Sequence, residues 1–476
     1  MRSYSEWSAF IKKNKIAQVD LKFCNLFGGW QHITIPAGGF SGKTLNEGIG
    51  FDGSSIPGFK TLEGGDMVCI PDLATGVMDP FWDRPTLSFI CDLAEADTRE
   101  PYERDPRRIL KKADQYMKKT EIASRSLWGP EFEFYIFSDV RFGTSVNRSF
   151  YEIDALEAFW NTGEASDRNL GYWIPQKGGY HEIPPRDKLY NLRALMAEHM
   201  ERVGIPIHYH HHEVGGPGQS EIEMELDEPL IAADRTMWAK YIVKMVASRN
   251  GQVATFMPKP LFEEAGSGMH FHQHLFKGNK PVFFDKKGYA GLSATALSYI
   301  AGVLHHADGL LAWTNPSTNS YKRLIPGYEA PVNTFFSLAN RSAAIRIPKY
   351  ATSPADKRFE FRPPDATCNI YLAIAAQLMA GLDGIRKKLD PTEMGFGPID
   401  EDVFTWDQQR RNSIRRLPGS LGEALIALEN DHRYLTEDDV FPPDMILAYA
   451  RYKYEHEHMA VQNRPHPYEM KLYFEA

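Results

Sequence analysis

The chain has 476 residues, of which 43% are hydrophobic and 24% are charged, as in an ordinary globular protein. This length suits two or three domains, or one large domain with a smaller one attached. The formal net charge of −8 argues against nucleic acid as a partner, because domains that bind it carry an excess of basic residues. No apolar run reaches the roughly 18 residues that a membrane-spanning helix needs, and the first residues do not resemble a signal peptide.

The four cysteines are scattered and have no spacing typical of a zinc site or a redox motif. We therefore expect buried thiols in a reducing compartment, the cytoplasm, and neither disulfides nor zinc ligands. They are Cys24, Cys69, Cys91 and Cys368.

The first hundred residues show alternating strand patterns separated by turns. A short helix is predicted over residues 5–13. Residues 19–23 and 30–35 flank a Gly-Gly turn and predict a hairpin, and residues 86–93 predict another strand. Residues 50–59 contain so much Gly and Ser that we expect a loop there.

A charged, proline-punctuated link over residues 101–106 marks a domain boundary. We expect one domain over residues 1–105 and a second over residues 106–476. Residues 160–185 are rich in Gly, Pro and Asn and predict a long functional loop. Apolar spacing predicts helices over residues 108–119, 192–203, 229–256, 294–313 and 370–389.

Strands and helices are mixed along the chain without a β-α-β rhythm. No G-x-G-x-x-G motif follows a strand. This order favours an α+β fold over a Rossmann fold.

Residues 129–137 alternate polar and aromatic side chains with the period of a strand. Glu131 and Glu133 then share one face, and Phe132 and Phe134 point the other way. Two carboxylates placed so closely repel unless a cation lies near them. Taken alone, however, this stretch is equally well explained as a strand with one solvated face.

The same alternation recurs in three other places, which favours a functional explanation. Unpaired buried charge costs several kcal/mol, so these charged faces are expected to line a cavity. Carboxylates in excess with a histidine suit Mg²⁺ or Mn²⁺ better than zinc, and arginines suit phosphate or carboxylate groups. The recurring charged residues are Glu213, Glu221, Glu223, His270, His272, His274, Arg358, Glu360 and Arg362.

Three loops add polar and flexible residues to this set. Residues 259–270 contain glycines that allow a backbone to approach a ligand closely. Residues 315–331 are dense in polar side chains, and residues 340–348 add Arg341 and Arg346. Four arginines beside six candidate metal ligands indicate a phosphoryl-transfer site, where catalysis depends on positioning and charge neutralisation.

On these motifs the chain closely resembles type I glutamine synthetase, over essentially its whole length. The matching stretches are residues 51–56, 129–134, 210–221, 259–272, 315–331, 340–348, 358–365 and 465–469. The resemblance implies that ATP phosphorylates the side-chain carboxylate of glutamate and that ammonia displaces the phosphate. It also implies a small N-terminal β-grasp domain and a large catalytic domain with a curved antiparallel sheet flanked by helices.

The resemblance further implies a dodecamer of two hexameric rings, with active sites formed between neighbouring subunits. It implies Mg²⁺ or Mn²⁺ at two sites, or three when nucleotide is bound, with glutamate, ammonium and ATP as substrates. By motif, one metal is assigned to Glu133, Glu213 and Glu221, and the second to Glu131, His270 and Glu360. Glutamate is assigned to Ala265, Gly266, Arg323, Glu329 and Arg362. The nucleotide and its phosphates are assigned to His272, His274, Arg341, Arg346 and Arg358. Catalysis is assigned to Asp52, Glu329 and Arg341, of which Asp52 and Glu329 form the ammonium pocket.

The chain departs from the family pattern at three positions. Ala265 stands where the family usually has Asn, His274 where it has Ser, and Ala355 where it often has Lys. Two other functions stay open: a related ligase that uses another amine, and a ring protein without enzymatic activity. Relatives of the first kind tend to lose residues 328–331 and Asp52, and the second would lose metal ligands. All of these residues are present here.

Overall fold

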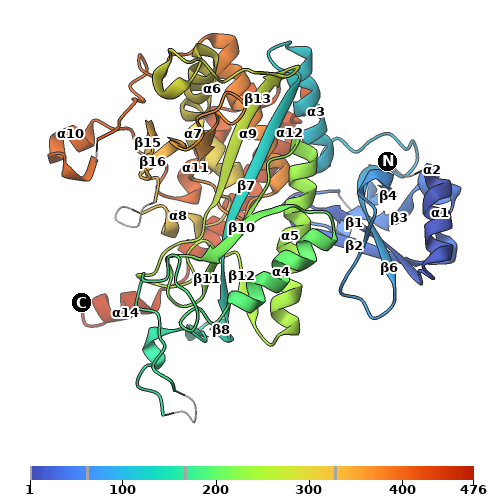
Figure 1. Ribbon diagram of the computed structural model, residues 1–476, viewed down its shortest axis with the longest axis horizontal. Coiled ribbons are helices and arrows are strands. Elements are labelled where there is room, and N and C mark those ends of the chain that lie inside the picture. The colour runs from blue at the N-terminus through green and yellow to red at the C-terminus, as the bar shows by residue number, and fades with distance from the viewer. Residues whose placement is uncertain (1–2, 61–63, 166–168, 326–329, 402) are drawn as a thin grey trace.

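The computed structural model describes residues 3–60, 64–165, 169–325, 330–401 and 403–476 (Figure 1). Two sheets dominate it, a six-stranded one near the N-terminus and a nine-stranded one in the rest of the chain. Strands and helices are mixed, as predicted. Among the described residues, none of the helices combines the length and apolar character that crossing a membrane would require.

The N-terminal sheet has the order β2-β1-β6-β4-β3, with β5 paired to β6. The predicted hairpin is present, since β1 and β2 pair antiparallel, and β1 also pairs parallel with β6. The elements of this part are α1 (Tyr4–Lys13), β1 (Gln18–Cys24), β2 (Trp30–Pro36), α2 (Gly42–Glu47), β3 (Ile49–Asp52), β4 (Asp66–Pro71), β5 (Val77–Met78) and β6 (Thr86–Glu95).

The prediction of a loop over residues 50–59 was partly wrong, because β3 covers Ile49–Asp52. Its backbone pairs with β4, from Ile49 opposite Cys69 to Asp52 opposite Asp66. Pairing with a neighbouring strand outweighs the low strand preference of glycine. β3 forms the edge of the sheet, so Asp52 ends an edge strand.

The second sheet has the order β10-β11-β7-β13-β17-β16-β15, with β12 paired to β7 and β14 to β13. All pairs are antiparallel except β15 with β16. Its strands are β7 (Arg125–Phe137), β10 (Ile207–His212), β11 (Gln219–Met224), β12 (Val253–Thr255), β13 (Met269–Lys277), β14 (Lys280–Pro281), β15 (Asn333–Leu338), β16 (Ala343–Ile347) and β17 (Phe359–Phe361).

Helices lie behind and beside this sheet and continue to the C-terminus (Figure 1). They are α3 (Pro106–Lys119), α4 (Tyr190–Arg202), α5 (Pro229–Arg249), α6 (Ala294–His305), α7 (Ala307–Thr314), α8 (Ser320–Arg323), α9 (Ile370–Lys387), α10 (Gln408–Asn412), α11 (Leu421–Asn430), α12 (Pro443–Lys453), α13 (Met459–Gln462) and α14 (Pro467–Tyr473). Residues 160–185 contain little regular structure where they are described, as expected of a long loop.

Two predicted helices are shorter than the sequence pattern indicated. The helix predicted over residues 229–256 ends at Arg249, where Gly251 adopts a positive φ of 69°. L-residues with side chains rarely adopt this conformation, and the chain then enters β12. The helix predicted over residues 294–313 is broken at His306 into α6 and α7.

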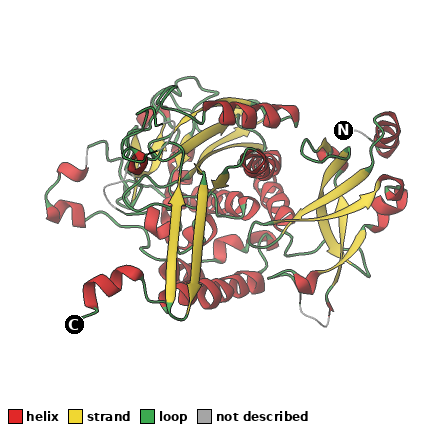
Figure 2. Cartoon of the chain, turned by 90° about the horizontal axis from the view of Figure 1, so that it is seen from below, coloured by secondary structure: helices red, strands yellow, loops and turns green. Residues whose placement is uncertain are grey.

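A hairpin of β8 (Asp139–Ser145) and β9 (Arg148–Asp154) was not predicted. Figure 2 shows it as two long strands in the middle of the view. Phe142 and Tyr151 on it are largely exposed. Alternation on both sides of the polar turn at Asn147 was the signal that could have revealed it.

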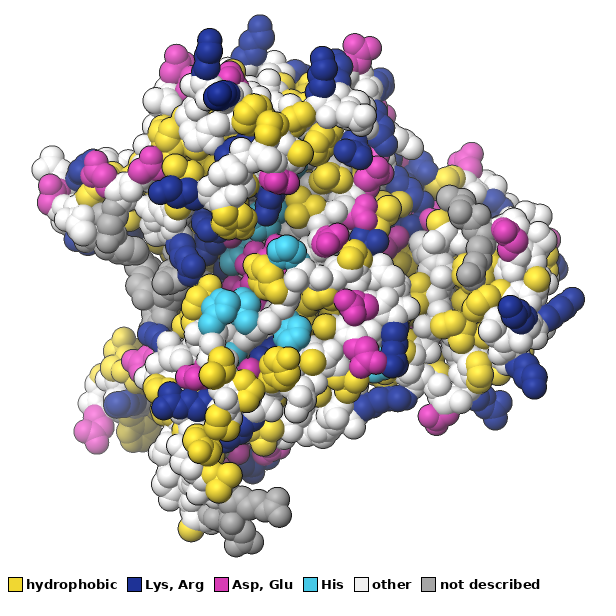
Figure 3. Space-filling model, in the orientation of Figure 1, with side chains coloured by type: hydrophobic (Ala, Val, Ile, Leu, Met, Phe, Trp, Pro, Cys, Tyr) yellow, Lys and Arg dark blue, Asp and Glu magenta, His cyan; other side chains and the backbone are white. Residues whose placement is uncertain are grey.

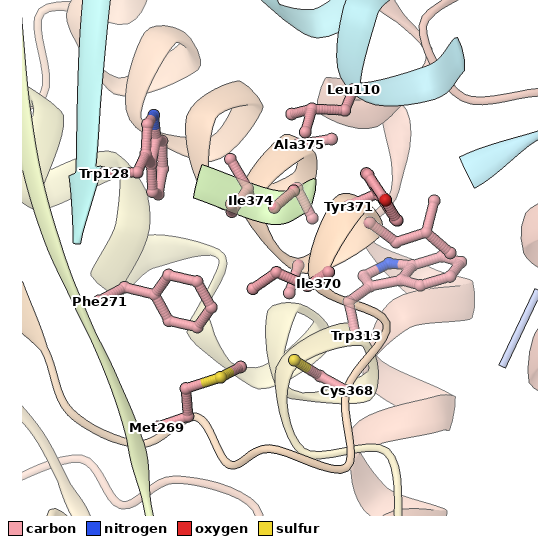
Figure 4. Packing of buried hydrophobic residues seen from close by; sticks show 14 of the residues in the cluster. Leu110, Trp128, Met269, Phe271, Trp313, Cys368, Ile370, Tyr371, Ile374 and Ala375 are labelled. Carbon is pink, nitrogen blue, oxygen red and sulfur yellow. The ribbon is translucent and has the colours of Figure 1, made fainter. Parts of the chain in front are cut away.

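The core lies between the large sheet and α9. Figure 4 shows Met269 and Phe271 of β13 on one side and Ile370 and Ile374 of α9 on the other. α9 is buried over its full circumference from Ile370 to Gly384, as expected of a helix inside a large core. The apolar back of the sheet is thereby covered, and only its front face is left for polar side chains.

Arg107 fastens the N-terminal sheet to the helices. Its guanidinium donates hydrogen bonds to Asp92 at 2.7 Å and Asp72 at 2.8 Å, both in the N-terminal part, and to Asp234 of α5 at 2.9 Å. Asp234 also accepts a hydrogen bond from the hydroxyl of Tyr371 at 2.8 Å. Arg107 is buried, so its charge depends on these carboxylates.

We predict that Arg107→Ala lowers the free energy of unfolding by roughly 3–5 kcal/mol, because it leaves partly buried carboxylates without their cation. Arg108→Ala is the matched control, since Arg108 pairs with the exposed Glu103. Denaturant unfolding followed by circular dichroism measures both. Equal, small losses in the two variants would contradict this role of Arg107.

His306, where α6 and α7 separate, lies between two carboxylates. Its Nε2 is 2.9 Å from Asp383 of α9, and its Nδ1 is 2.6 Å from Asp431 after α11. Burial opposes protonation, but the hydrogen bonds that the ring makes to Asp383 and Asp431 outweigh it and raise the pKa of His306. The ring therefore ties the junction of α6 and α7 to α9 and to the end of α11.

Because the folded pKa of His306 is raised, its stabilising contribution is complete below the unfolded pKa of about 6.5 and is lost as pH rises through the folded pKa. We predict that the stability difference between wild type and His306→Gln shrinks as pH rises above about 6.5. Thermal unfolding across this range measures it. A difference that stays constant or grows would show that His306 is not charged in the folded protein.

Candidate active site

The front of the large sheet carries acidic and histidine side chains in register. On neighbouring strands β11 and β7, Glu221 stands opposite Glu133 and Glu223 opposite Glu131. On the other side of β7, His270 of β13 stands opposite Glu131. Figure 3 shows a hollow in the middle of one face where histidine, acidic and basic side chains gather.

The row continues across β13, β17 and β16. Glu360 of β17 stands opposite His272 on one side and Arg346 on the other. Neighbouring strands lie about 4.8 Å apart. Residues far apart in the sequence are thereby brought onto one small surface.

Glu133, Glu213 and Glu221 form the first candidate metal group, since one oxygen from each lies within 4.8 Å of the others. Glu133 and Glu221 are buried and Glu213 is partly buried. Glu213 lies just after β10, where its N–H donates to the carbonyl of Gln219 at 2.9 Å.

Glu131, His270 and Glu360 form the second group, with the same 4.8 Å limit between their donor atoms. His270 Nδ1 is 3.4 Å from a carboxylate oxygen of each partner. The structure thus brings together the six residues that the family resemblance assigned to two metals, in the same two sets of three.

Burial and crowding raise the pKa values of two carboxylates in the first group. Burial, followed by repulsion from Glu133, raises the pKa of Glu213 to about 8. Burial, followed by repulsion from Glu131 and Glu133, raises the pKa of Glu221 well above its usual range. Without a cation, these carboxylates would hold protons near neutral pH.

The second group is balanced by positive partners. Burial opposes ionisation of Glu131, but hydrogen bonds from His270 and His272 hold its pKa well below the usual range. Burial also opposes ionisation of Glu360, but the charges of Arg362 and His270 lower its pKa to about 2.

The donor set fits hard divalent cations. Five carboxylates and one imidazole are available in two groups, and no cysteine takes part. Mg²⁺ and Mn²⁺ prefer oxygen ligands, whereas structural zinc sites use more Cys or His. The first, all-carboxylate group also has the crowding that a cation would relieve.

Arginines surround the second group. Arg346 Nη1 donates to Glu360 Oε2 at 2.7 Å, and Arg362 Nη1 donates to the other oxygen of Glu360. Arg362 Nε donates to the carbonyl of Arg341 at 3.2 Å. The guanidinium of Arg341 lies 5.7 Å from the ring centre of Tyr180.

Arg323 is buried at the end of α8. It donates to the carbonyls of Pro363 at 2.7 Å and Arg362 at 3.2 Å. Gly266 and Gly268 lie against it, and a Cβ on either would meet the Arg323 side chain. Two glycines of the predicted flexible loop are therefore explained by close packing against this arginine.

The loop that contains Ala265 is fixed by neighbouring side chains. The hydroxyl of Tyr135 donates to the carbonyl of Ala265 at 2.7 Å. Gln219 Nε2 donates to the carbonyl of Gly266 at 3.0 Å and to Ser267 Oγ at 3.2 Å. The backbone that was assigned to glutamate thus borders the first candidate metal group.

His272 and His274 continue along β13 beyond His270. Arg358 Nε donates to His272 Nδ1 at 3.3 Å, and His272 Nε2 lies 3.2 Å from Glu131 Oε2. His274 is buried with its ring stacked on Phe283. Burial, followed by repulsion from Arg358, lowers the pKa of His274 to about 4.

Asp52 is not part of this cluster within one chain. It ends β3 in the N-terminal sheet and is exposed. Its carboxylate accepts hydrogen bonds from Ser54 N at 2.8 Å, Ser54 Oγ at 2.6 Å and Ser55 Oγ at 2.9 Å. An aspartate that only fixes its own turn would make these contacts as well. Glu329 lies outside the described residues.

Two features near the site were not assigned from the sequence. Glu223 forms a third group with Glu131 and His272. Its place in the alternating pattern of β11 was the available signal. The buried pair of His212 and Glu157 has an N–O distance of 3.1 Å, and His212 also hydrogen-bonds the carbonyl of Glu213. The sequence spacing of that pair carries no signal.

The chain as a whole is similar to known proteins. The family model for the glutamine synthetase catalytic domain matches residues 103–473, and the one for the glutamine synthetase β-grasp domain matches residues 15–96. A glutamine synthetase of Frankia alni is 47% identical over 467 residues, which cover 98% of both chains.

Solved structures show the same architecture. A glutamine synthetase of Plasmodium falciparum has a TM-score of 0.90 and 28% identity, and the match covers 99% of each chain. A complex of GmaS with ADP has a TM-score of 0.80 and 25% identity, covering 98% of this chain and 99% of GmaS. The predicted α+β fold with an N-terminal β-grasp domain is confirmed, and the chain belongs to the glutamine synthetase family.

Proposed function

We propose that the chain makes glutamine from glutamate, ammonia and ATP at the front face of the large sheet. Membership of the family gives the activity, glutamate–ammonia ligation. We place the reaction on this face because two groups of three candidate metal ligands lie there beside several arginines. ATP phosphorylates the side-chain carboxylate of glutamate, and ammonia then displaces phosphate from the γ-glutamyl phosphate.

Divalent cations, Mg²⁺ or Mn²⁺, are proposed at two positions. Glu133, Glu213 and Glu221 would hold one, and the second would be held by Glu131, His270 and Glu360. When bound, such ions neutralise the charge that develops on the transferred phosphoryl group.

The proposed substrate contacts come from the arginines and the glycine loop. Arg323 and Arg362, together with the backbone at Ala265 and Gly266, would bind the carboxylates of glutamate. Bidentate pairing with carboxylate or phosphate suits the planar guanidinium. Arg341, Arg346 and Arg358 would face the ATP phosphates, with His272 and His274 on the nucleotide side. Arg341 acts on the transferred group.

Ammonium is proposed to bind between Asp52 and Glu329, where a carboxylate attracts the cation and takes its proton before attack. Asp52 lies on the exposed edge of the N-terminal sheet, away from its own chain's metal groups. We therefore propose that Asp52 serves the site of a neighbouring subunit.

A dodecamer of two hexameric rings is proposed as the assembly. Its support is the exposure of apolar side chains on projecting parts of the chain. In α14 and the residue after it, Tyr468, Met470, Leu472, Tyr473 and Phe474 are all exposed. Figure 1 shows this C-terminal helix extending away from the body. Apolar patches of this kind mark contacts with other subunits.

Two further assignments complete the proposal. A domain boundary between residues 105 and 106 is proposed; the two family models, which match residues 15–96 and 103–473, leave their gap a few residues before it. Location in the cytoplasm is supported by the four cysteines, all of which are free and buried.

The reaction is tested by following ADP release with glutamate, ATP and Mg²⁺, with and without ammonium. We expect release to depend on ammonium and to match glutamine formation one for one. Polyamines and ethanolamine in place of ammonium test the related ligases. Faster release with one of these amines than with ammonium would assign the chain to another reaction.

We predict that Glu133→Ala and Glu360→Ala each lower kcat by at least about 100-fold at saturating Mg²⁺, because each removes a ligand that positions the charge-neutralising ion. Glu225→Ala, which removes an exposed carboxylate just after β11, is the control and should retain full activity. Near wild-type turnover in either ligand variant would refute the metal assignment.

The shared site predicts complementation between inactive chains. Asp52→Ala should leave Mn²⁺ and glutamate binding intact and abolish glutamine synthesis. Co-assembly of Asp52→Ala with Glu133→Ala should then recover activity, because about a quarter of interfaces in randomly mixed rings would hold one intact site. Mixed rings, verified by mass spectrometry, that stay as inactive as both parents would rule out sharing between subunits.

A further inference from the structure

The third group of possible metal ligands, Glu131, Glu223 and His272, has the same 4.8 Å compactness as the two proposed metal sites. Glu223 is buried, and neither the two metals nor the substrates account for it. Geometry alone would therefore support a third ion. The hydrogen bonds of His272 decide whether it can bind one.

Both ring nitrogens of His272 are engaged. Arg358 Nε donates to Nδ1 at 3.3 Å, and Nε2 lies 3.2 Å from Glu131 Oε2. A guanidinium is always protonated in proteins, so Arg358 can only be the donor. Nδ1 must then offer its lone pair and carry no proton.

This contact fixes the tautomer of His272. A neutral imidazole with a lone pair on Nδ1 carries its proton on Nε2. That N–H points at Glu131, which accepts it. An imidazolium is excluded by the same contact, since it would direct a second N–H at the N–H of Arg358.

A ring in this state has no lone pair for a cation. Metal ligation uses a deprotonated ring nitrogen, and the only lone pair of His272 is already used by Arg358. Glu223 stands opposite Tyr209 of β10 in the sheet register. His272, which the third group needs as a ligand, therefore has hydrogen-bond partners in place of an ion.

We infer that His272 is a positioning residue that holds the metal ligand Glu131 through a directed hydrogen-bond chain from Arg358, and that the group of Glu131, Glu223 and His272 holds no metal. The inference rests on the proposed role of Glu131 as a ligand. The chain joins an arginine proposed to face phosphate to a carboxylate proposed to hold a metal, so their positions depend on each other. Carboxylate ligands are commonly oriented by such outer hydrogen bonds.

Equilibrium binding of Mn²⁺, followed by electron paramagnetic resonance of the free ion and without nucleotide, tests this assignment without an activity measurement. We expect two ions per chain in wild type. His272→Ala should weaken one of the two sites by about 10–100-fold, the usual effect of losing an outer hydrogen bond. His272→Gln, whose amide N–H can still reach Glu131, should restore most of that affinity.

Glu223→Gln separates positioning from ligation, with Glu225→Gln as the matched exposed control. Both should still bind two ions with near wild-type affinity. Three ions in wild type that fall to two in Glu223→Gln and His272→Ala would overturn the inference, as would unchanged binding in His272→Ala. A wild-type chain that binds no Mn²⁺ saturably would instead overturn the metal assignment of the proposed function.

Discussion

Two pairs of like charges opposite each other on β7 and β11 are the constraint on which the rest of the site depends. Glu133 faces Glu221, and Glu131 faces Glu223, on adjacent strands in a partly enclosed surface. Like charges directly opposite one another destabilise a sheet. Burial, followed by repulsion from neighbouring carboxylates, raises the pKa values of Glu213 and Glu221. Bound cations, or protons on the carboxylates, would relieve this repulsion.

The surroundings of the second group follow from this constraint. Glu131 and Glu360 stay ionised because histidines and arginines lie against them. The arginines among them also border the space where phosphate and glutamate are proposed to bind. The same arginines therefore stabilise the carboxylate face and prepare it for anionic substrates, which suits a reaction that depends on positioning and charge.

The two sheets have different roles. The large sheet and α9 hold the charged face rigidly, since the apolar back of the sheet is buried against that helix (Figure 4). The N-terminal sheet is fastened to the same helices by Arg107. It leaves β3 and Asp52 on an outer edge, where a neighbouring chain can meet them.

Much of the site could be predicted because charged and apolar residues alternate along its strands. That pattern identified Glu131, Glu133, Glu221, His270 and Glu360 before any register was known. The pairing register of the strands could not be predicted from the sequence. The division of the metal ligands into two sets of three therefore came from the family resemblance.

The failures have local physical causes. β3 was missed because strand pairing outweighs the glycine content of Ile49–Asp52. The break between α6 and α7 falls at His306, which meets Asp383 and Asp431, and these residues lie too far apart in sequence to be matched. The departure residues His274 and Ala355 also meet only in the fold, where the ring hydrogen-bonds the backbone of Ala355.

The central claim is that carboxylates facing each other across β7 and β11 create a cation site and lower the stability of the metal-free fold. Thermal unfolding of chelated protein, compared between wild type and the double variant Glu133→Gln/Glu221→Gln with and without added Mn²⁺, tests it most directly. The account predicts that the metal-free double variant has the higher Tm, and that Mn²⁺ raises the Tm of wild type far more than that of the variant. A metal-free wild type as stable as the variant, with no response to Mn²⁺, would contradict it.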